Sequence, residues 1–346
     1  MTQLVLVVPG LVWPAPQALH PAGDVPHAAL SRLLGRGRQS VESAVSCEYL
    51  LARLLGMEHR YRAFPFAALR RLGEKDGSEY AQGEGRAHWL CADPVNLSFM
   101  GGHVVLDAFN EGEIDATEAA ALIGALNDEF ASLGHFSAVT PTRWYLRMER
   151  SVEIDFFPLD EAVCRPVQNF LPVEGDENGH WRHALNEVQV ALHNHPVNAA
   201  REAVGQRSIN SLWFWGNGAQ SASTSSGKPR FAVQALDPMA RGLARAAGIE
   251  PDTLGVNSAL CADTLVVLDM LASPFRHLDS ARWQDALAVL EQDWFVSIER
   301  ALGRGALRHF ILHVPGERSS FSLTLDRGAR WCFWRKPLSL AHLSQT

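Results

Sequence analysis

The pattern of hydrophobic and polar positions is most informative in residues 186–218, where it predicts two helices, a buried strand and a glycine turn. A first helix should end near His195, because Pro196 restricts the residue before it to extended geometry. Pro196 suits the first turn of a second helix, and Gly205 can end that helix in a left-handed conformation. Residues 209–215 are a nearly continuous apolar run, which is typical of a strand covered on both faces in a parallel sheet.

Similar patterns along the rest of the chain predict a large α/β domain. Short apolar runs predict buried strands at 4–8, 231–236 and 265–271, and the first of these leads directly into Pro9 and Gly10. Helical spacing predicts helices at 26–34, 41–55, 238–247 and, as the longest, 283–302. Turn residues divide the C-terminal part into three further predicted strands, at 307–314, 319–325 and 330–334.

A smaller α+β domain is predicted within this α/β core. Residues 88–106 alternate as two strands, Asp115 or Thr117 can cap a helix that runs to Phe130, and residues 143–150 form another strand. The polar, glycine-rich residues 73–85 are the predicted crossover. We therefore expect a core of residues 1–85 and 166–346 and an inserted domain of residues 86–165.

The composition is that of a globular protein of the cytoplasm. Of the 346 residues, 47% are hydrophobic and 20% are charged, and the formal charge of −7 argues against a nucleic-acid partner. The longest apolar run, 4–9, is too short to cross a membrane. The five cysteines are widely spaced and form no C-x-x-C pair, so neither a disulfide framework nor a thiolate zinc site is predicted.

Several motifs resemble those of the archaeal-type cofactor-independent phosphoglycerate mutases, a branch of the alkaline phosphatase superfamily. The stretch HPVNAAREAVGQRSINSLWFWGNG at 195–218 is similar to the family's His-Pro-Val-Asn and Asn-x-Ile-Trp-Leu-Trp-Gly-x-Gly motifs, and residues 88–130 resemble its inserted domain. Weaker matches are VVPGL at 7–11, FAVQALDPMARGLARAAGI at 231–249 and VVLDMLASPF at 266–275. Within that branch the chain looks most like bacterial regulatory proteins of the RpfE type. The resemblance implies an alkaline-phosphatase-like, mainly parallel sheet sandwiched by helices.

The resemblance also implies a catalytic centre whose residues this sequence largely lacks. Such enzymes hold two divalent metal ions with Asp and His ligands and pass a phosphoryl group through a Ser or Thr nucleophile. Pro9 stands where the first Asp ligand is expected, and residues 3–30 contain no Ser or Thr. Around 270–277 only His277 matches a ligand, and the late Asp-His pair falls near Glu317 and Arg318. We expect no catalytic residue and no cofactor. If the protein is active instead, Asp269, His277 and His313 are the candidate ligands for two manganese or zinc ions.

Candidate ligand-binding residues lie on a loop and on a strand. Asn217, Ser221 and Lys228 belong to a loop rich in hydroxyl groups that follows the predicted strand 209–215, a place where α/β sheets bind ligands. Arg143, with Arg147 and Arg150, is suited to a carboxylate or phosphate. The alternative interpretations are an ordinary surface loop and ordinary exposed arginines.

Two functional hypotheses follow. The first is a non-catalytic homologue with a regulatory or small-ligand-binding role, whose partner is a small anion or another protein. The second is an active metal-dependent phosphoglycerate mutase or phosphoryl-transfer enzyme with displaced ligands. The tryptophans near the C-terminus, Trp331 and Trp334, are a candidate protein interface. The sequence leaves the oligomeric state open.

Overall fold

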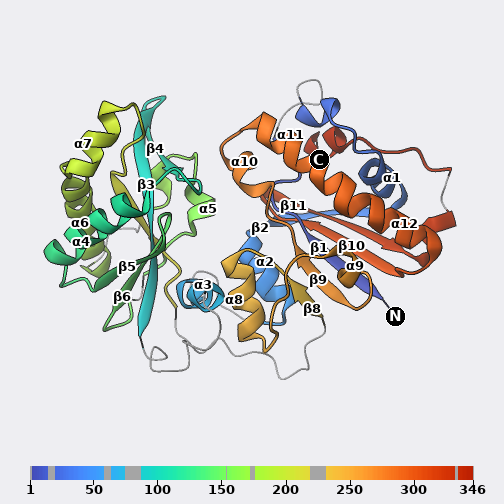
Figure 1. Cartoon of the computed structure of the whole chain (residues 1–346), viewed down its shortest axis with the longest axis horizontal. Coiled ribbons are helices and arrows are strands. Elements are labelled where there is room, and N and C mark those ends of the chain that lie inside the picture. Colours follow the sequence, from blue (N-terminus) through green and yellow to red (C-terminus); the bar gives the residue numbers. More distant parts are fainter. Residues whose placement is uncertain are drawn as a thin grey trace. The chain divides into compact units, whose positions relative to one another are not determined.

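A computed structural model of the chain describes residues 2–14, 20–57, 64–74, 87–152, 154–171, 176–218, 231–331 and 334–345. The chain forms two compact units: unit 1 comprises Met1–Met57 and Thr224–Thr346, and unit 2 comprises Glu58–Ser223. Figure 1 shows both units, with helices and strands labelled where there is room. No helix in the described ranges is both long enough and apolar enough to span a membrane.

Unit 1 is built on a six-stranded sheet in the order β2-β11-β10-β1-β9-β8. The strands are β1 (Gln3–Val7), β2 (Arg38–Val45), β8 (Ala232–Gln234), β9 (Thr264–Val267), β10 (His309–Val314) and β11 (Gly316–Asp326). Four neighbours, β10, β1, β9 and β8, are parallel, whereas β11 and β2 are added antiparallel at one side. The expected mainly parallel sheet is therefore confirmed.

Helices flank this sheet. They are α1 (Ala28–Arg36), α2 (Cys47–Leu54), α8 (Pro238–Ala246), α9 (Val256–Ala259), α10 (Ala272–Arg276), α11 (Ser280–Leu290) and α12 (Val296–Arg304), together with short 3-10 turns at Pro21–Asp24, Arg327–Trp331 and Leu340–Gln345. Leu4 and Leu6 of β1 pack in one core with side chains of α1, α11 and α12. A π turn at Glu291–Phe295 joins α11 to α12, so the predicted long helix is one continuous helix with this irregularity.

Unit 2 contains a five-stranded antiparallel sheet. Its path is β4-β3-β6-β5, formed by β3 (His88–Met100), β4 (His103–Ala108), β5 (His135–Thr140) and β6 (Arg143–Met148), and β7 (Ser211–Trp215) also pairs with β3. Its helices are α3 (Phe66–Glu74), α4 (Ala116–Glu129), α5 (Leu159–Ala162), α6 (Asp176–His193) and α7 (Pro196–Ala203), with a 3-10 turn at Val167–Asn169.

The strand predicted at 209–215 is present, but its assignment to the parallel sheet is wrong. β7 runs antiparallel to β3 in unit 2. It is buried on both faces because successive side chains point to opposite sides: Trp215 lies towards α3, and Phe214 contacts Trp181 of α6. A strand of an antiparallel sheet that is covered on both faces therefore has the same continuous apolar run as a buried strand of a parallel sheet.

Two smaller predictions are wrong, and one observed strand was not predicted. The region 41–55 is not one helix, because residues 38–45 pair with β11 as an exposed edge strand and α2 starts only after Ser46. The third C-terminal strand is wrong, since Arg327–Trp331 form a 3-10 turn, and β5 was not predicted. The predicted inserted domain, 86–165, lies wholly within unit 2, which is larger because α3, α6, α7 and β7 belong to it as well.

Candidate functional site

The carboxyl end of β1 is the first candidate site, because ligands of open α/β sheets bind beyond the carboxyl ends of the strands. β1 is followed by Val8, Pro9 and Gly10, and Gly10 adopts a φ of 78°. A Cβ on Gly10 would lie 2.6 Å from the Leu271 carbonyl oxygen and 2.9 Å from the Phe275 Cβ. The backbone at this point is therefore packed directly against the start of α10, and no side chain fits there.

Aromatic side chains fill the space beside Gly10. We call Trp13, His20, Phe275 and Trp283 the aromatic cluster. The rings of Trp13 and Trp283 lie 5.4 Å apart, those of Trp13 and Phe275 6.2 Å apart, and those of His20 and Trp283 5.8 Å apart. Trp283 is fully buried and donates its indole N–H to the Gly10 carbonyl at 2.8 Å. The end of β1 is thus an apolar, closely packed region.

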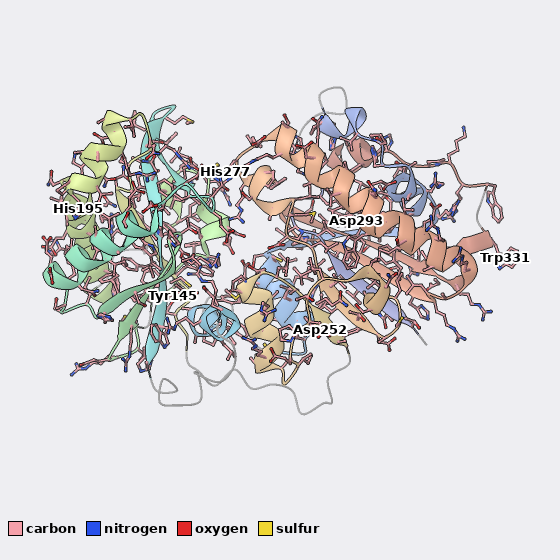
Figure 2. The ribbon with its side chains drawn as sticks, in the orientation of Figure 1. Tyr145, His195, Asp252, His277, Asp293 and Trp331 are labelled. Carbon is pink, nitrogen blue, oxygen red and sulfur yellow. The ribbon has the colours of Figure 1, made fainter. Side chains whose placement is uncertain are left out.

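The three candidate metal ligands lie in unit 1 but are not gathered into one site. Asp269 follows β9, and His313 is paired with Val7 across the β1–β10 register. His277, labelled in Figure 2, follows α10. Its Nδ1 lies 3.0 Å from the carbonyl oxygen of Ser273 in α10. Burial, and secondly the Arg53 guanidinium, lower the pKa of His313. Among the described residues no three His, Cys, Asp or Glu side chains are grouped so that they could hold a metal ion.

The buried His20 should make stability depend on pH. Burial, with a smaller effect of His27, lowers the pKa of His20 to about 4. The unfolded chain therefore binds more protons than the folded one between this value and the ordinary pKa of about 6.5. The contribution of neutral His20 to stability is complete above pH 6.5 and is lost as the pH falls towards 4, by at most about 3–4 kcal/mol.

His20→Asn tests this expectation, because an asparagine oxygen can replace His20 Nδ1 as acceptor of the Ala22 N–H, which lies 3.1 Å away, without titrating. Urea denaturation at pH 7.5 and 4.5 should show a smaller loss of stability on acidification for His20→Asn than for the wild type. His103→Asn, at an exposed position, is the matched control and should keep the wild-type loss. An equal loss of stability on acidification in all three proteins would show that His20 does not cause the pH dependence.

The glycine turn after β7 is the second candidate site. Asn217 is buried and donates its amide hydrogens to the carbonyl oxygens of Val152 and Ile154, at 2.8 Å each. Gly216, at φ 78°, packs against α3, and its carbonyl accepts the Ala67 N–H. Asn217 therefore holds the turn against Val152 and Ile154. Ser221 and Lys228 lie outside the described residues.

Arg143 belongs to a network of charged side chains in unit 2. Its guanidinium lies 3.3 Å from Glu74 and 3.0 Å from Glu111. Burial opposes the charge of Arg143, but Glu74 and then Glu111 raise its pKa above the ordinary value. The same Glu74 accepts the hydroxyl hydrogen of Tyr145. The cationic group of Arg143 is thus satisfied by protein carboxylates.

The centre of this network is a buried ion pair that the sequence did not reveal. Arg70 of α3 donates two hydrogen bonds to the carboxylate of Asp93 on β3, at 2.7 and 2.8 Å. Asp93 also accepts the Trp215 indole N–H at 2.8 Å, and Arg70 donates to the Tyr145 hydroxyl at 2.8 Å. Burial opposes the charge of Arg70, but Asp93 raises its pKa well above the ordinary value. The pair fixes α3 to the sheet.

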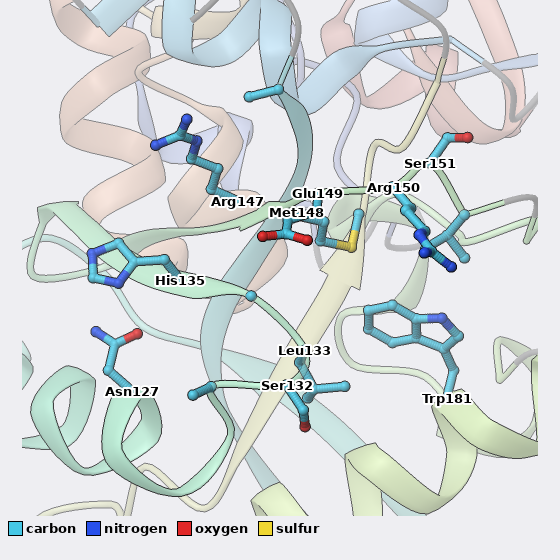
Figure 3. Close-up of a pocket in the computed structure, with 14 residues that line it drawn as sticks. Asn127, Ser132, Leu133, His135, Arg147, Met148, Glu149, Arg150, Ser151 and Trp181 are labelled. Carbon is cyan, nitrogen blue, oxygen red and sulfur yellow. The ribbon is translucent and has the colours of Figure 1, made fainter.

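The third candidate is an open groove in unit 2, about 1200 Å³ in volume, at the ends of β5 and β6 (Figure 3). Arg147, Arg150 and His135 line it, together with Glu149, Ser132 and the buried Trp181. Of the three arginines considered together in the sequence, only Arg147 and Arg150 reach this groove, whereas Arg143 is bound in the network described above.

Comparison with curated proteins finds similar sequences among archaeal enzymes. Over 114 residues the chain is 35% identical to 2,3-bisphosphoglycerate-independent phosphoglycerate mutase 2 of Methanothermobacter thermautotrophicus. The matched segment covers 32% of this chain and 28% of the relative. A 2,3-bisphosphoglycerate-independent phosphoglycerate mutase of Methanosarcina barkeri is 24% identical over 119 residues, which cover 34% of this chain and 30% of the relative. That of Methanosarcina mazei is 23% identical over 155 residues, which cover 43% of this chain and 38% of the relative. The matched segments span roughly a third of the length of these relatives.

Comparison with solved structures extends over the whole chain. The PH0037 protein from Pyrococcus horikoshii superposes with a TM-score of 0.55 at 12% identity, covering 99% of this chain and 92% of that one. A cofactor-independent phosphoglycerate mutase from Thermoplasma acidophilum gives a TM-score of 0.45 at 17% identity, covering 99% and 95%. No family model matches the chain.

Proposed function

We propose that this chain, a homologue of archaeal cofactor-independent phosphoglycerate mutases, is a non-catalytic relative with a regulatory or small-ligand-binding role in the cytoplasm. The observation that carries the proposal is the apolar packing at the end of β1, where Gly10 lies against Leu271 and Phe275 and beside the aromatic cluster.

This region does not fit two divalent metal ions. Hard and borderline cations need several carboxylate or imidazole ligands at one point. Here the chain provides Pro9, Gly10 and aromatic rings, and His20 is held neutral near pH 7 because burial lowers its pKa to about 4. A phosphoryl group would also find no serine or threonine nucleophile in residues 3–30.

Metal analysis and a mutase assay test the proposal. The purified full chain is incubated with manganese or zinc, dialysed and analysed for bound metal, and conversion of 3-phosphoglycerate to 2-phosphoglycerate is followed in parallel. We expect no stoichiometric metal and no conversion above the rate without protein. An active archaeal mutase, treated identically, is the positive control. Two bound equivalents together with turnover would overturn the proposal.

The alternative is an active metal-dependent phosphoglycerate mutase or phosphoryl-transfer enzyme, which the 35% identity over 114 residues favours. In that case Asp269, His277 and His313 are the residues to replace by alanine, one at a time. If the wild type binds metal, loss of that metal in these variants would assign the ligands.

A further inference from the structure

The groove in unit 2 concentrates basic side chains. Arg147, on the exposed side of β6, and Arg150, just after this strand, are its two arginines, and Glu149 is its only acidic lining residue among those described. Figure 3 shows Arg147 and His135 on one side, Arg150 near Trp181 on the other, and the Glu149 carboxylate between them. The lining is therefore net positive in a chain with a formal charge of −7.

The strand register forces two of these basic groups together. In the antiparallel β5–β6 pair, His135 stands directly opposite Arg147. Side chains opposite each other share a face of the sheet, with Cβ atoms about 5 Å apart. An anion bound between them can accept hydrogen bonds from the Arg147 guanidinium and from a ring N–H of His135.

The two arginines of the groove also differ from other arginines of unit 2. Arg70, Arg143, Arg201 and Arg207 each lie within 3.5 Å of a carboxylate oxygen of Asp93, Glu74, Glu118 and Asp107, respectively. Within the described part of the chain, Arg147 and Arg150 form no such ion pair. Their guanidinium groups, which bind phosphate and carboxylate through two parallel hydrogen bonds, are accordingly available to a ligand.

We propose that the groove binds a small organic ligand with two anionic groups, of the bisphosphate class, held by Arg147 and His135 at one end and by Arg150 at the other. Arg150 lies beyond the end of β6, where the chain bends, and Figure 3 shows Arg147 and Arg150 on opposite sides of the groove, an arrangement that suits two anionic groups on one small molecule. Glu149, between them, accepts a hydrogen bond from a hydroxyl group of that chain. This site gives the ligand-binding role proposed above a location, and in that respect it rests on the proposed function.

Isothermal titration calorimetry of the full chain tests the site with fructose 1,6-bisphosphate as the probe, because it carries phosphates at both ends of a hydroxylated chain. Inorganic phosphate and fructose are the single-anion and uncharged comparisons. We expect the bisphosphate to bind more tightly than phosphate, and fructose not to bind. Arg147→Gln and Arg150→Gln should each weaken bisphosphate binding about ten- to a hundredfold, since a hydrogen bond to a charged group contributes about 1.5–3 kcal/mol.

Arg304→Gln, at an exposed arginine of unit 1, is the matched control and should bind like the wild type. Circular dichroism melts of all variants verify folding, which the exposed positions of Arg147 and Arg150 should leave unchanged. The site is disproved if the wild type binds no bisphosphate, or if both glutamine variants bind it as the wild type does. A positive mutase assay would reject the proposed function alone, because the loss of binding in the groove variants is measured independently of turnover.

Discussion

Replacing Asp93 by alanine is expected to destabilise unit 2 by about 3–5 kcal/mol, because breaking a buried ion pair from one side leaves an uncompensated charge. Arg70 and Asp93 are 7% and 2% exposed, so water cannot replace the lost carboxylate. The change also removes the acceptor of the Trp215 indole N–H, which lies 2.8 Å from Asp93. Urea denaturation, followed by fluorescence and circular dichroism, measures the loss.

Glu111→Ala is the control for this expectation, because it breaks an ion pair of the same unit whose acidic side chain is 81% exposed. Exposed ion pairs contribute about 0–1 kcal/mol, so this variant should unfold close to the wild type. An Asp93→Ala loss no larger than that of Glu111→Ala would show that the Arg70–Asp93 pair does not hold α3 on the sheet.

The sequence predicts elements whose signals are local. Local residue types predict a helix cap at Asp115 or Thr117, and the structure shows that Asp115 is the cap, in a complete capping box with Glu118. Likewise, α7 begins at Pro196, and Gly205 adopts a left-handed conformation just after its end, as predicted. The partner of a strand is not a local property. The run at 209–215 was placed in the wrong sheet, because its pairing with β3 depends on residues about 120 positions away.

The candidate sites show the same limit. The sequence shows that Pro9 stands where the resemblance implies an Asp ligand, but it does not show the packing beside this residue, since Trp283 lies 273 positions from Gly10. Arg70 and Asp93 gave no signal, because a single arginine and a single aspartate in separate elements form no motif. Arg147 and Arg150 were noticed with Arg143, and only the fold separates the arginine bound by Glu74 from the two that line the groove.

The candidate sites of the two units differ in their chemistry. Unit 1 retains a parallel sheet whose carboxyl end is filled by apolar side chains, and unit 2 contains a groove lined with basic ones. A protein of this kind can bind an anion in unit 2 whether or not unit 1 has catalytic activity. The metal analysis and the calorimetry therefore test separate properties of one chain.

Trp283→Ala should destabilise unit 1 by about 3–5 kcal/mol, the usual cost of removing a large aromatic side chain from a core. Trp283 is fully buried, contacts the rings of Trp13 and His20, and donates to the Gly10 carbonyl at 2.8 Å. Trp283→Phe keeps much of the packing but loses this hydrogen bond, so it should cost less than alanine. Val289→Ala, on the same helix but 46% exposed, should change stability little. Urea denaturation of the four proteins gives the comparison, and an alanine loss below about 1 kcal/mol would show that the end of β1 is not closely packed and has room for a ligand.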